Sequence, residues 1–257
     1  MQFGICGGPE VAGLAIQAGY DYFEWSVGGL LKPREDKAAF SQALAEVRQT
    51  GLTCPAVNVF IPADLKVTGP STDLASLEAY ITTAFHRANL AGVKTIVFGS
   101  GGARRIPEGF DRAEARNQLV AFCRMLAPVA QSQGVTVVIE PLNLAECNVL
   151  TTVGECARLV RQVNQPAIRL LVDAYHLLRD GDVMEDILAN RDILAHVHVA
   201  TIPNRLAPGM EVCALEPFFG LLARSGYDGR VSIEGKLPDN AADLTHSLAL
   251  MMNWMGI

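Results

Sequence analysis

Short apolar runs alternate with longer amphipathic segments along the whole chain. The runs predict strands at residues 3–6, 22–25, 56–60, 95–98, 135–140, 169–173, 194–200 and 230–234. The segments between them predict a first helix ending near residue 19 and further helices at about 36–50, 72–91, 111–134, 153–163, 183–190, 215–225 and 241–254. Strands that alternate with helices of this length imply parallel βαβ units. We therefore expect an α/β fold, and eight units fit a closed (β/α)8 TIM barrel better than an open sheet.

The length of 257 residues is close to the roughly 250 typical of one such barrel. No linker or low-complexity tract interrupts it, so residues 1–257 are expected to form a single domain. Residues 4–10, at the end of the first apolar run and directly after it, lack the G-x-G-x-x-G motif of a dinucleotide-binding turn. A glycine-rich turn at 99–102 precedes Arg104 and Arg105. We expect a tight loop with two solvated arginines there, with phosphate binding as the weaker alternative.

Four successive apolar runs in the C-terminal half each end in a residue of a type that commonly binds metals. These residues are Glu140, Asp173, His198 and Glu234. A carboxylate usually avoids a buried strand unless something pairs with it. Residues two apart in a strand share a face, so terminal side chains that point into a barrel mouth would converge there. Active sites of this fold lie at the C-terminal ends of the strands. Taken alone, each acid could instead be a loop residue or a helix N-cap. That interpretation becomes weaker because the same pattern recurs at four consecutive strand ends.

Three carboxylates brought together would repel one another, and some would stay protonated unless a cation compensated them. A divalent cation is therefore predicted at these four residues. Oxygen-rich ligation with one imidazole suits Mn²⁺ best, with Mg²⁺ or Co²⁺ as alternatives. Zn²⁺ fits less well, because its sites usually carry more Cys or His.

The same residues lie in motifs that resemble the ketose 3-epimerases and hydroxypyruvate isomerases. These are sugar isomerases and epimerases of the xylose-isomerase-like TIM-barrel superfamily. The matching motifs are Glu140-Pro-Leu-Asn143 with Glu146, Asp173-Ala-Tyr-His176, His196-Val-His198 with Pro203-Asn-Arg205, and Ser232-Ile-Glu234. The resemblance implies that Glu140, Asp173, His198 and Glu234 hold the metal. It also implies that Glu140 and Glu234 are the acid/base pair and that Glu146, His176 and Arg205 contact the substrate.

The resemblance implies an enzyme, a divalent-metal-dependent isomerase or epimerase of a small ketose or hydroxy-carbonyl compound. Proton transfer would pass through a metal-stabilised enediolate. Inverting a carbon needs proton removal on one face and return on the other, which Glu140 and Glu234 could supply together. His176 and Arg205 would hold the carbonyl oxygen. An aldose–ketose isomerase could use the same residues with one base.

Several alternatives stay open at this point. Arg205 follows His198 by seven residues, a spacing closer to hydroxypyruvate isomerases, whereas His198 itself agrees with the epimerases. A hydro-lyase such as inosose dehydratase would use the same enolate chemistry. A DNA-repair endonuclease of the related AP-endonuclease barrel type needs several zinc ions, more histidines and a basic groove. A non-catalytic sugar-binding module has little need for two carboxylates on the metal.

Three further residues have two interpretations each. His196 shares a face with His198 and is either a substrate contact or a packed core histidine. Trp25 closes the second run and is either an apolar wall of the substrate pocket or a core residue. Lys236 follows the last ligand and either reaches a substrate oxygen or balances the acidic site.

The composition limits where in the cell the protein is expected and which kinds of partner it is expected to bind. The net charge of −6 argues against nucleic acid as a partner. Mean hydropathy is +0.23, but no uninterrupted apolar segment is long enough to span a bilayer. Six scattered cysteines without a secretory leader predict reduced thiols and a cytoplasmic protein. The expected partner is a small-molecule substrate, and similar enzymes suggest a homodimer or homotetramer.

Overall fold

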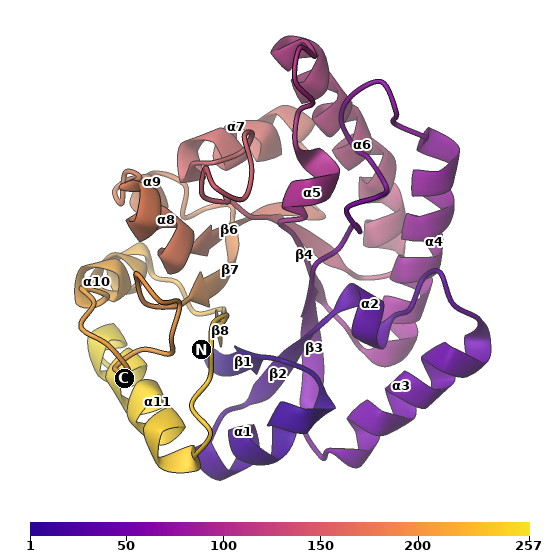
Figure 1. The fold of residues 1–257 in the computed structure, drawn as a ribbon. Helices are drawn as coiled ribbons and strands as arrows, with labels where there is room; N and C mark the ends of the chain where they lie inside the picture. Colours follow the sequence, from indigo (N-terminus) through magenta and orange to yellow (C-terminus); the bar gives the residue numbers. More distant parts are fainter.

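The computed structural model describes all 257 residues and contains one closed barrel of eight parallel strands. Each strand pairs with the next in the chain, and the last pairs with the first (Figure 1). The strands are β1 Gln2–Cys6, β2 Tyr22–Ser26, β3 Thr53–Asn58, β4 Thr95–Phe98, β5 Thr136–Ile139, β6 Ile168–Asp173, β7 Leu194–Val199 and β8 Arg230–Ile233. The predicted (β/α)8 barrel is confirmed.

The helices form an outer ring around the barrel, and the chain runs once around it from indigo to yellow in Figure 1. Long helices connect most strands, and short ones precede or follow several of them. The helices are η1 Pro9–Val11, α1 Ala12–Ala18, α2 Val27–Leu30, α3 Lys37–Gln49, α4 Leu74–Ala91, α5 Gly101–Arg104, α6 Arg112–Ser132, α7 Val153–Val163, α8 Ala174–Asp180, α9 Asp186–Ala189, α10 Glu216–Ser225 and α11 Ala241–Met255.

Polar side chains begin most of the long helices. Asp36, Asp111, Thr152 and Asn240 each accept a hydrogen bond from the backbone N–H three residues later. This N-cap bond satisfies a donor that the helix itself cannot pair. Local sequence therefore fixes where these helices start, as the hydrophobic pattern had indicated.

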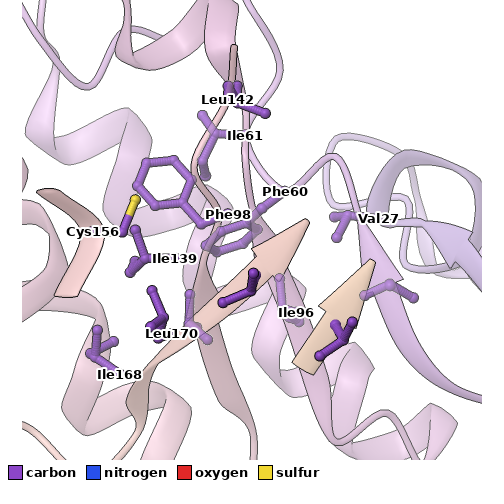
Figure 2. Packing of buried hydrophobic residues seen from close by; sticks show 14 of the residues in the cluster. Val27, Phe60, Ile61, Ile96, Phe98, Ile139, Leu142, Cys156, Ile168 and Leu170 are labelled. Atoms are coloured by element: carbon purple, nitrogen blue, oxygen red, sulfur yellow. The ribbon is translucent and has the colours of Figure 1, made fainter. Parts of the chain in front are cut away.

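The core has two layers, and alternate residues of a strand belong to different ones. Phe98 belongs to the large outer cluster and packs on Phe122 of α6 with ring centroids 5.4 Å apart. Figure 2 shows Phe98 among outer-layer residues such as Phe60 and Ile139. Val97, Val138 and Leu171 form a separate small cluster, which fills the barrel interior. Strands buried on both faces explain the near-continuous apolar runs of the sequence.

Two predicted boundaries are wrong for local reasons. The third strand covers Thr53–Asn58 rather than 56–60, because Val59 has a φ of 52° and leaves the extended conformation. Phe60, expected in that strand, packs in the outer core instead. The helix expected at 183–190 is only the single turn α9, since α8 already begins directly after β6. The carboxylate of Asp173 caps α8. The apolar pattern predicts Asp173 only as the end of a strand and so does not predict that a helix begins there.

The glycine-rich turn contains a further correction. Gly101–Arg104 forms the short helix α5, and Arg104 is fully buried rather than solvated. Arg105 is exposed, as expected.

All six cysteines are free thiols. None of the helices has both the length and the apolar character needed to cross a membrane.

Candidate metal centre and active site

The side chains at the ends of β5, β6 and β8 meet at the mouth of the barrel. Glu140 follows β5 directly, Asp173 is the last residue of β6, and Glu234 follows β8. One ligand atom each from Glu140, Asp173, Glu234 and His176 lie within 4.8 Å of one another. His198 joins them from β7, with Nδ1 3.0 Å from Glu140 Oε1 and 3.6 Å from Glu234 Oε2. We call these five residues the mouth cluster.

The alternation of the strands explains why these side chains converge. Glu140 lies two residues after Val138, and Asp173 two after Leu171. Both of these apolar side chains fill the barrel interior, so the acids two positions later lie on the same inward face. Parallel pairing sets Asp173 directly beside His198 across β6 and β7. The four residues expected from the strand ends are thus neighbours, and His176 reaches them from α8.

Two buried polar atoms of the mouth cluster have no hydrogen-bond partner. They are Asp173 Oδ2 and His176 Nε2, which lie 3.5 Å apart. Buried polar atoms are almost always paired, so such orphans call for an explanation. A cation would use lone pairs of this kind, and a carboxylate-rich set suits a hard divalent ion. The residues present therefore fit a metal ion.

Charge in the mouth cluster is unevenly distributed. Burial and the neighbouring charge of Glu234 raise the pKa of Glu140. Burial by itself would also raise the pKa of Glu234, but the positive charges of His198 and Arg205 lower it to about 2. Burial opposes protonation of His198, yet the carboxylates of Glu24, Glu234 and Glu140 raise its pKa well above 6.5. A charged His198 thus offsets part of the acidic charge that a divalent cation would offset.

Glu24 is a functional-site residue that the sequence interpretation missed. It is the third residue of β2, fully buried, and its carboxylate lies 2.9 Å from His198 Nε2 and 2.8 Å from His196 Nε2. Ser232 Oγ donates to it at 2.6 Å. Burial favours the neutral acid, but the two histidines hold the pKa of Glu24 far below its usual range. An acid inside an apolar strand was the signal, the same one that marked the strand ends.

His196 lies beneath His198 and has no exposed surface. Burial lowers its pKa, although Glu24 acts in the opposite direction. Its position is that of a packed histidine bonded to Glu24, the second of the two interpretations.

Arg205 connects the mouth cluster to its rim. Its Nη1 donates to Glu146 Oε1 at 3.3 Å, its Nη2 donates to the Glu234 carboxylate, and its Nε donates to the Glu234 carbonyl at 3.1 Å. The guanidinium lies over the ring of Tyr175, 4.5 Å from the centroid. Asn143 Nδ2 bridges Glu146 at 2.9 Å and His176 Nδ1 at 2.8 Å. The three residues expected to contact substrate therefore belong to one hydrogen-bonded rim.

Trp25 and Lys236 lie outside this network. Trp25 is half-buried between Gly8 and Gly29, where an added Cβ would come within 2.8 Å and 2.4 Å of the indole. Its indole therefore packs against the backbone of Gly8, which precedes η1, and of Gly29 in α2. The Lys236 side chain is exposed, and only its backbone is hydrogen-bonded, with its N–H donating to the Arg205 carbonyl at 2.7 Å.

Arg104 supports the mouth cluster from behind. Its Nη1 donates to the carbonyl of Phe98 at 3.0 Å, and its Nη2 donates to the carbonyls of Glu140 at 2.7 Å and Leu150 at 3.2 Å. It fixes the backbone that carries Glu140. No pattern in the sequence indicates this role, because an arginine in a glycine-rich turn is usually solvated.

Comparison with known proteins identifies the family of the chain. The family model described as xylose isomerase-like TIM barrel matches residues 13–254. The chain belongs to this family. The resemblance noted from the sequence motifs is therefore confirmed at the level of the family.

Several relatives of the chain are named as epimerases or isomerases. The chain is 26% identical to L-ribulose 3-epimerase of Methylomonas sp. (strain DH-1) over 225 residues, 86% of this chain and 75% of that protein. It is 25% identical to hydroxypyruvate isomerase of Escherichia coli (strain K12) over 135 residues, 51% of this chain and 52% of that enzyme. A solved D-psicose 3-epimerase shares the fold, with a TM-score of 0.85, 17% identity and complete coverage of both chains. With most of the curated relatives, the match spans about half of their length.

Proposed function

We propose that this protein is a divalent-metal-dependent isomerase or epimerase of a small ketose or hydroxy-carbonyl compound. The observation that carries the proposal is the mouth cluster, in which ligand atoms of three carboxylates and a histidine lie within 4.8 Å. Its position at the C-terminal ends of the strands is where this fold holds its active sites. The names of the relatives support the substrate class.

Glu140, Asp173, His198 and Glu234 would hold the cation, with His176 close by. Mn²⁺ is the ion we favour, Mg²⁺ and Co²⁺ fit the same ligands, and Zn²⁺ fits them less well. When bound, the cation would supply Lewis-acid stabilisation of the negative charge that develops on the substrate oxygens. The unpaired Oδ2 of Asp173 is the atom that most directly supports this assignment.

Glu140 and Glu234 would move the proton. They directly follow β5 and β8, and the pKa of Glu140 is raised while that of Glu234 is lowered. Paired carboxyl groups with separated pKa values are suited to one donating while the other accepts. Such a pair could remove a proton from one face of a carbon and return it on the other.

The rim would orient the substrate. Arg205 and Glu146 present a donor and an acceptor at the edge of the mouth cluster and bond to each other, and Asn143 links Glu146 to His176 within the cluster. Trp25 as an apolar wall and Lys236 as an outer contact stay part of the proposal. We propose no substrate role for His196, because it lies deeper in β7 than His198 and its Nε2 is 2.8 Å from the carboxylate of Glu24. A cytoplasmic location, a homo-oligomeric state and the absence of a nucleic-acid partner also stay proposals.

A second candidate is hydroxypyruvate isomerase. The match to the enzyme of that name favours it, together with the seven-residue step from His198 to Arg205. It uses the same site chemistry with a smaller substrate. A hydro-lyase would be recognised by the loss of water in the mass of the product.

The test is proton exchange in variants of the two proposed acid/base residues. Wild type, Glu140→Gln and Glu234→Gln are incubated in D2O with ketohexoses, ketopentoses or hydroxypyruvate. Mn²⁺ is kept at a concentration that saturates each variant. Both variants should lose about 10²- to 10⁴-fold in the rate of deuterium incorporation. Glu46→Gln, on the exposed face of α3, serves as the control and should match wild type. Unchanged exchange in both site variants would refute the acid/base assignment.

A further inference from the structure

The two ring nitrogens of His198 face different partners. Nδ1 faces the mouth cluster, 3.0 Å from Glu140 Oε1 and 3.6 Å from Glu234 Oε2. Nε2 faces the barrel interior, 2.9 Å from Glu24 Oε1. Only Nδ1 can therefore bind a cation at the mouth while the other contact is kept.

Glu24 has strong reasons to keep this contact. Its hydrogen-bond partners are His198, His196 and Ser232, and no lysine or arginine bonds to it. A fully buried carboxylate that loses a charged or polar partner is destabilised by several kcal/mol. Turning the His198 ring over would remove a donor from Glu24, so the carboxylate opposes that rotation.

The carboxylate itself is held from several strands. Glu24 comes from β2, the two histidines from β7, and Ser232 from β8. Tyr22 lies behind Ser232, with its hydroxyl 2.8 Å from Ser232 Oγ. All of these side chains are buried, so the position of Glu24 does not depend on solvent or on loops.

We propose that Glu24 is a positioning residue that holds His198 with Nδ1 towards the cation and thereby sets the affinity of the site for metal. The inference rests on the proposed function. Histidines that bind metals commonly donate their other N–H to a carboxylate, and loss of that partner costs about 10- to 100-fold in metal affinity. Glu24 adds a residue from the second strand to a centre whose proposed ligands all come from the C-terminal half of the chain.

The test measures Mn²⁺ binding to metal-free protein by calorimetric titration. Glu24→Gln keeps the shape of the side chain but removes the charge, and Kd should rise about 10- to 100-fold. Tyr22→Phe is the matched control, because it alters the same buried network yet leaves all three contacts of Glu24, and Kd should stay within about 2-fold of wild type. A merely structural role for Glu24 would lower thermal stability and leave Kd of the folded protein unchanged, and that result would overturn the proposal.

A measurement on the unaltered protein covers the case in which Glu24→Gln does not fold. In Mg²⁺-loaded wild type with ¹⁵N-labelled histidines, His198 should carry its proton on Nε2 and show a ligand shift on Nδ1. The reverse pattern would overturn the inference. If wild type binds no Mn²⁺, the proposed metal centre fails together with it. If wild type binds Mn²⁺ and Glu24→Gln binds equally well, only the role of Glu24 fails.

Discussion

At the scale of single residues, Arg104 shows how a side chain outside the mouth cluster can determine its geometry. The guanidinium is fully buried and donates to three backbone carbonyls, with no carboxylate among its hydrogen-bond partners. One of those carbonyls belongs to Glu140. Its fork of donors spans the ends of β4 and β5, which a lysine could not do with a single ammonium group.

We expect Arg104→Leu to lower the free energy of unfolding by about 3–5 kcal/mol, because it leaves buried carbonyls without donors. Arg105→Leu is the adjacent control. Arg105 is exposed and donates to the carbonyls of Ala145 and Glu146, so its loss should cost less than about 1 kcal/mol. Urea unfolding of both variants checks this, and equal losses would contradict the structural role of Arg104.

At the scale of elements, the junctions after the strands combine structural and chemical tasks. Asp173 Oδ1 accepts from the N–H groups of Tyr175 and His176 and so begins α8, while Oδ2 stays unpaired at the mouth cluster. One carboxylate thus caps a helix and offers a ligand atom. The same helix start carries His176 into the cluster, which is why the Asp-x-x-His spacing matters.

Gly99, directly after β4, provides space for a neighbouring strand end. A Cβ there would lie 2.1 Å from Glu140 Oε2, so Gly99→Ala should displace this carboxylate. We expect about a 10-fold or greater loss of Mn²⁺ affinity, similar to other disturbances of ligand orientation. Gly220→Ala is the control. Its Cβ would meet nothing within 4 Å on α10, and alanine should stabilise that helix by up to about 1 kcal/mol. Equal Mn²⁺ affinity in both variants would exclude this effect of Gly99.

At the scale of the whole molecule, closure of the barrel brings together acids and histidines from β2, β6 and β7 and from the ends of β5 and β8. Stability should therefore depend on pH and on metal together. His198 has a raised pKa, so its contribution is complete below pH 6.5 and is lost as the pH rises through the folded value. His196 has a lowered pKa, so stability increases as the pH rises towards 6.5.

Thermal unfolding of the metal-free protein should accordingly be most resistant near the usual histidine pKa of 6.5. Mn²⁺ at about 100 times Kd should add about 2.7 kcal/mol, or about 5–10 °C. The gain should be larger at alkaline pH, because cation binding at Nδ1 of His198 requires that this nitrogen be deprotonated. Calorimetry from about pH 5 to 9, with Mn²⁺ or with EDTA, checks this. A metal-free midpoint that keeps rising above pH 7 would contradict the assignment of His198.

The apolar pattern was sufficient to predict the eight strands, because a strand buried on both faces appears in the sequence as an uninterrupted run of apolar residues. It was insufficient at the third strand and at α8. There, the left-handed Val59 and the capping side chain of Asp173 decided the boundaries. The strand-end residues could be predicted to converge because period-two alternation and parallel pairing place them on one face at one pole. Glu24 carried the same signal, an acid inside an apolar strand, but its partners lie on distant strands. Arg104 could not be predicted, since nothing local distinguishes a buried arginine in a glycine-rich turn from a solvated one.

By itself, the sequence determined the order of elements, the barrel and the set of side chains at its mouth. All of these follow from local periodicity and from the direction of parallel strands. Only the tertiary structure decided which nitrogen of His198 faces the cluster, which oxygen of Asp173 is left unpaired, and which arginine is buried. The burial of Arg104 depends on contacts with the strand ends and loop around Glu140 and Leu150. The orientation of His198 depends on its contact with Glu24, which lies more than a hundred positions away in the chain. Such contacts arise only when the barrel closes.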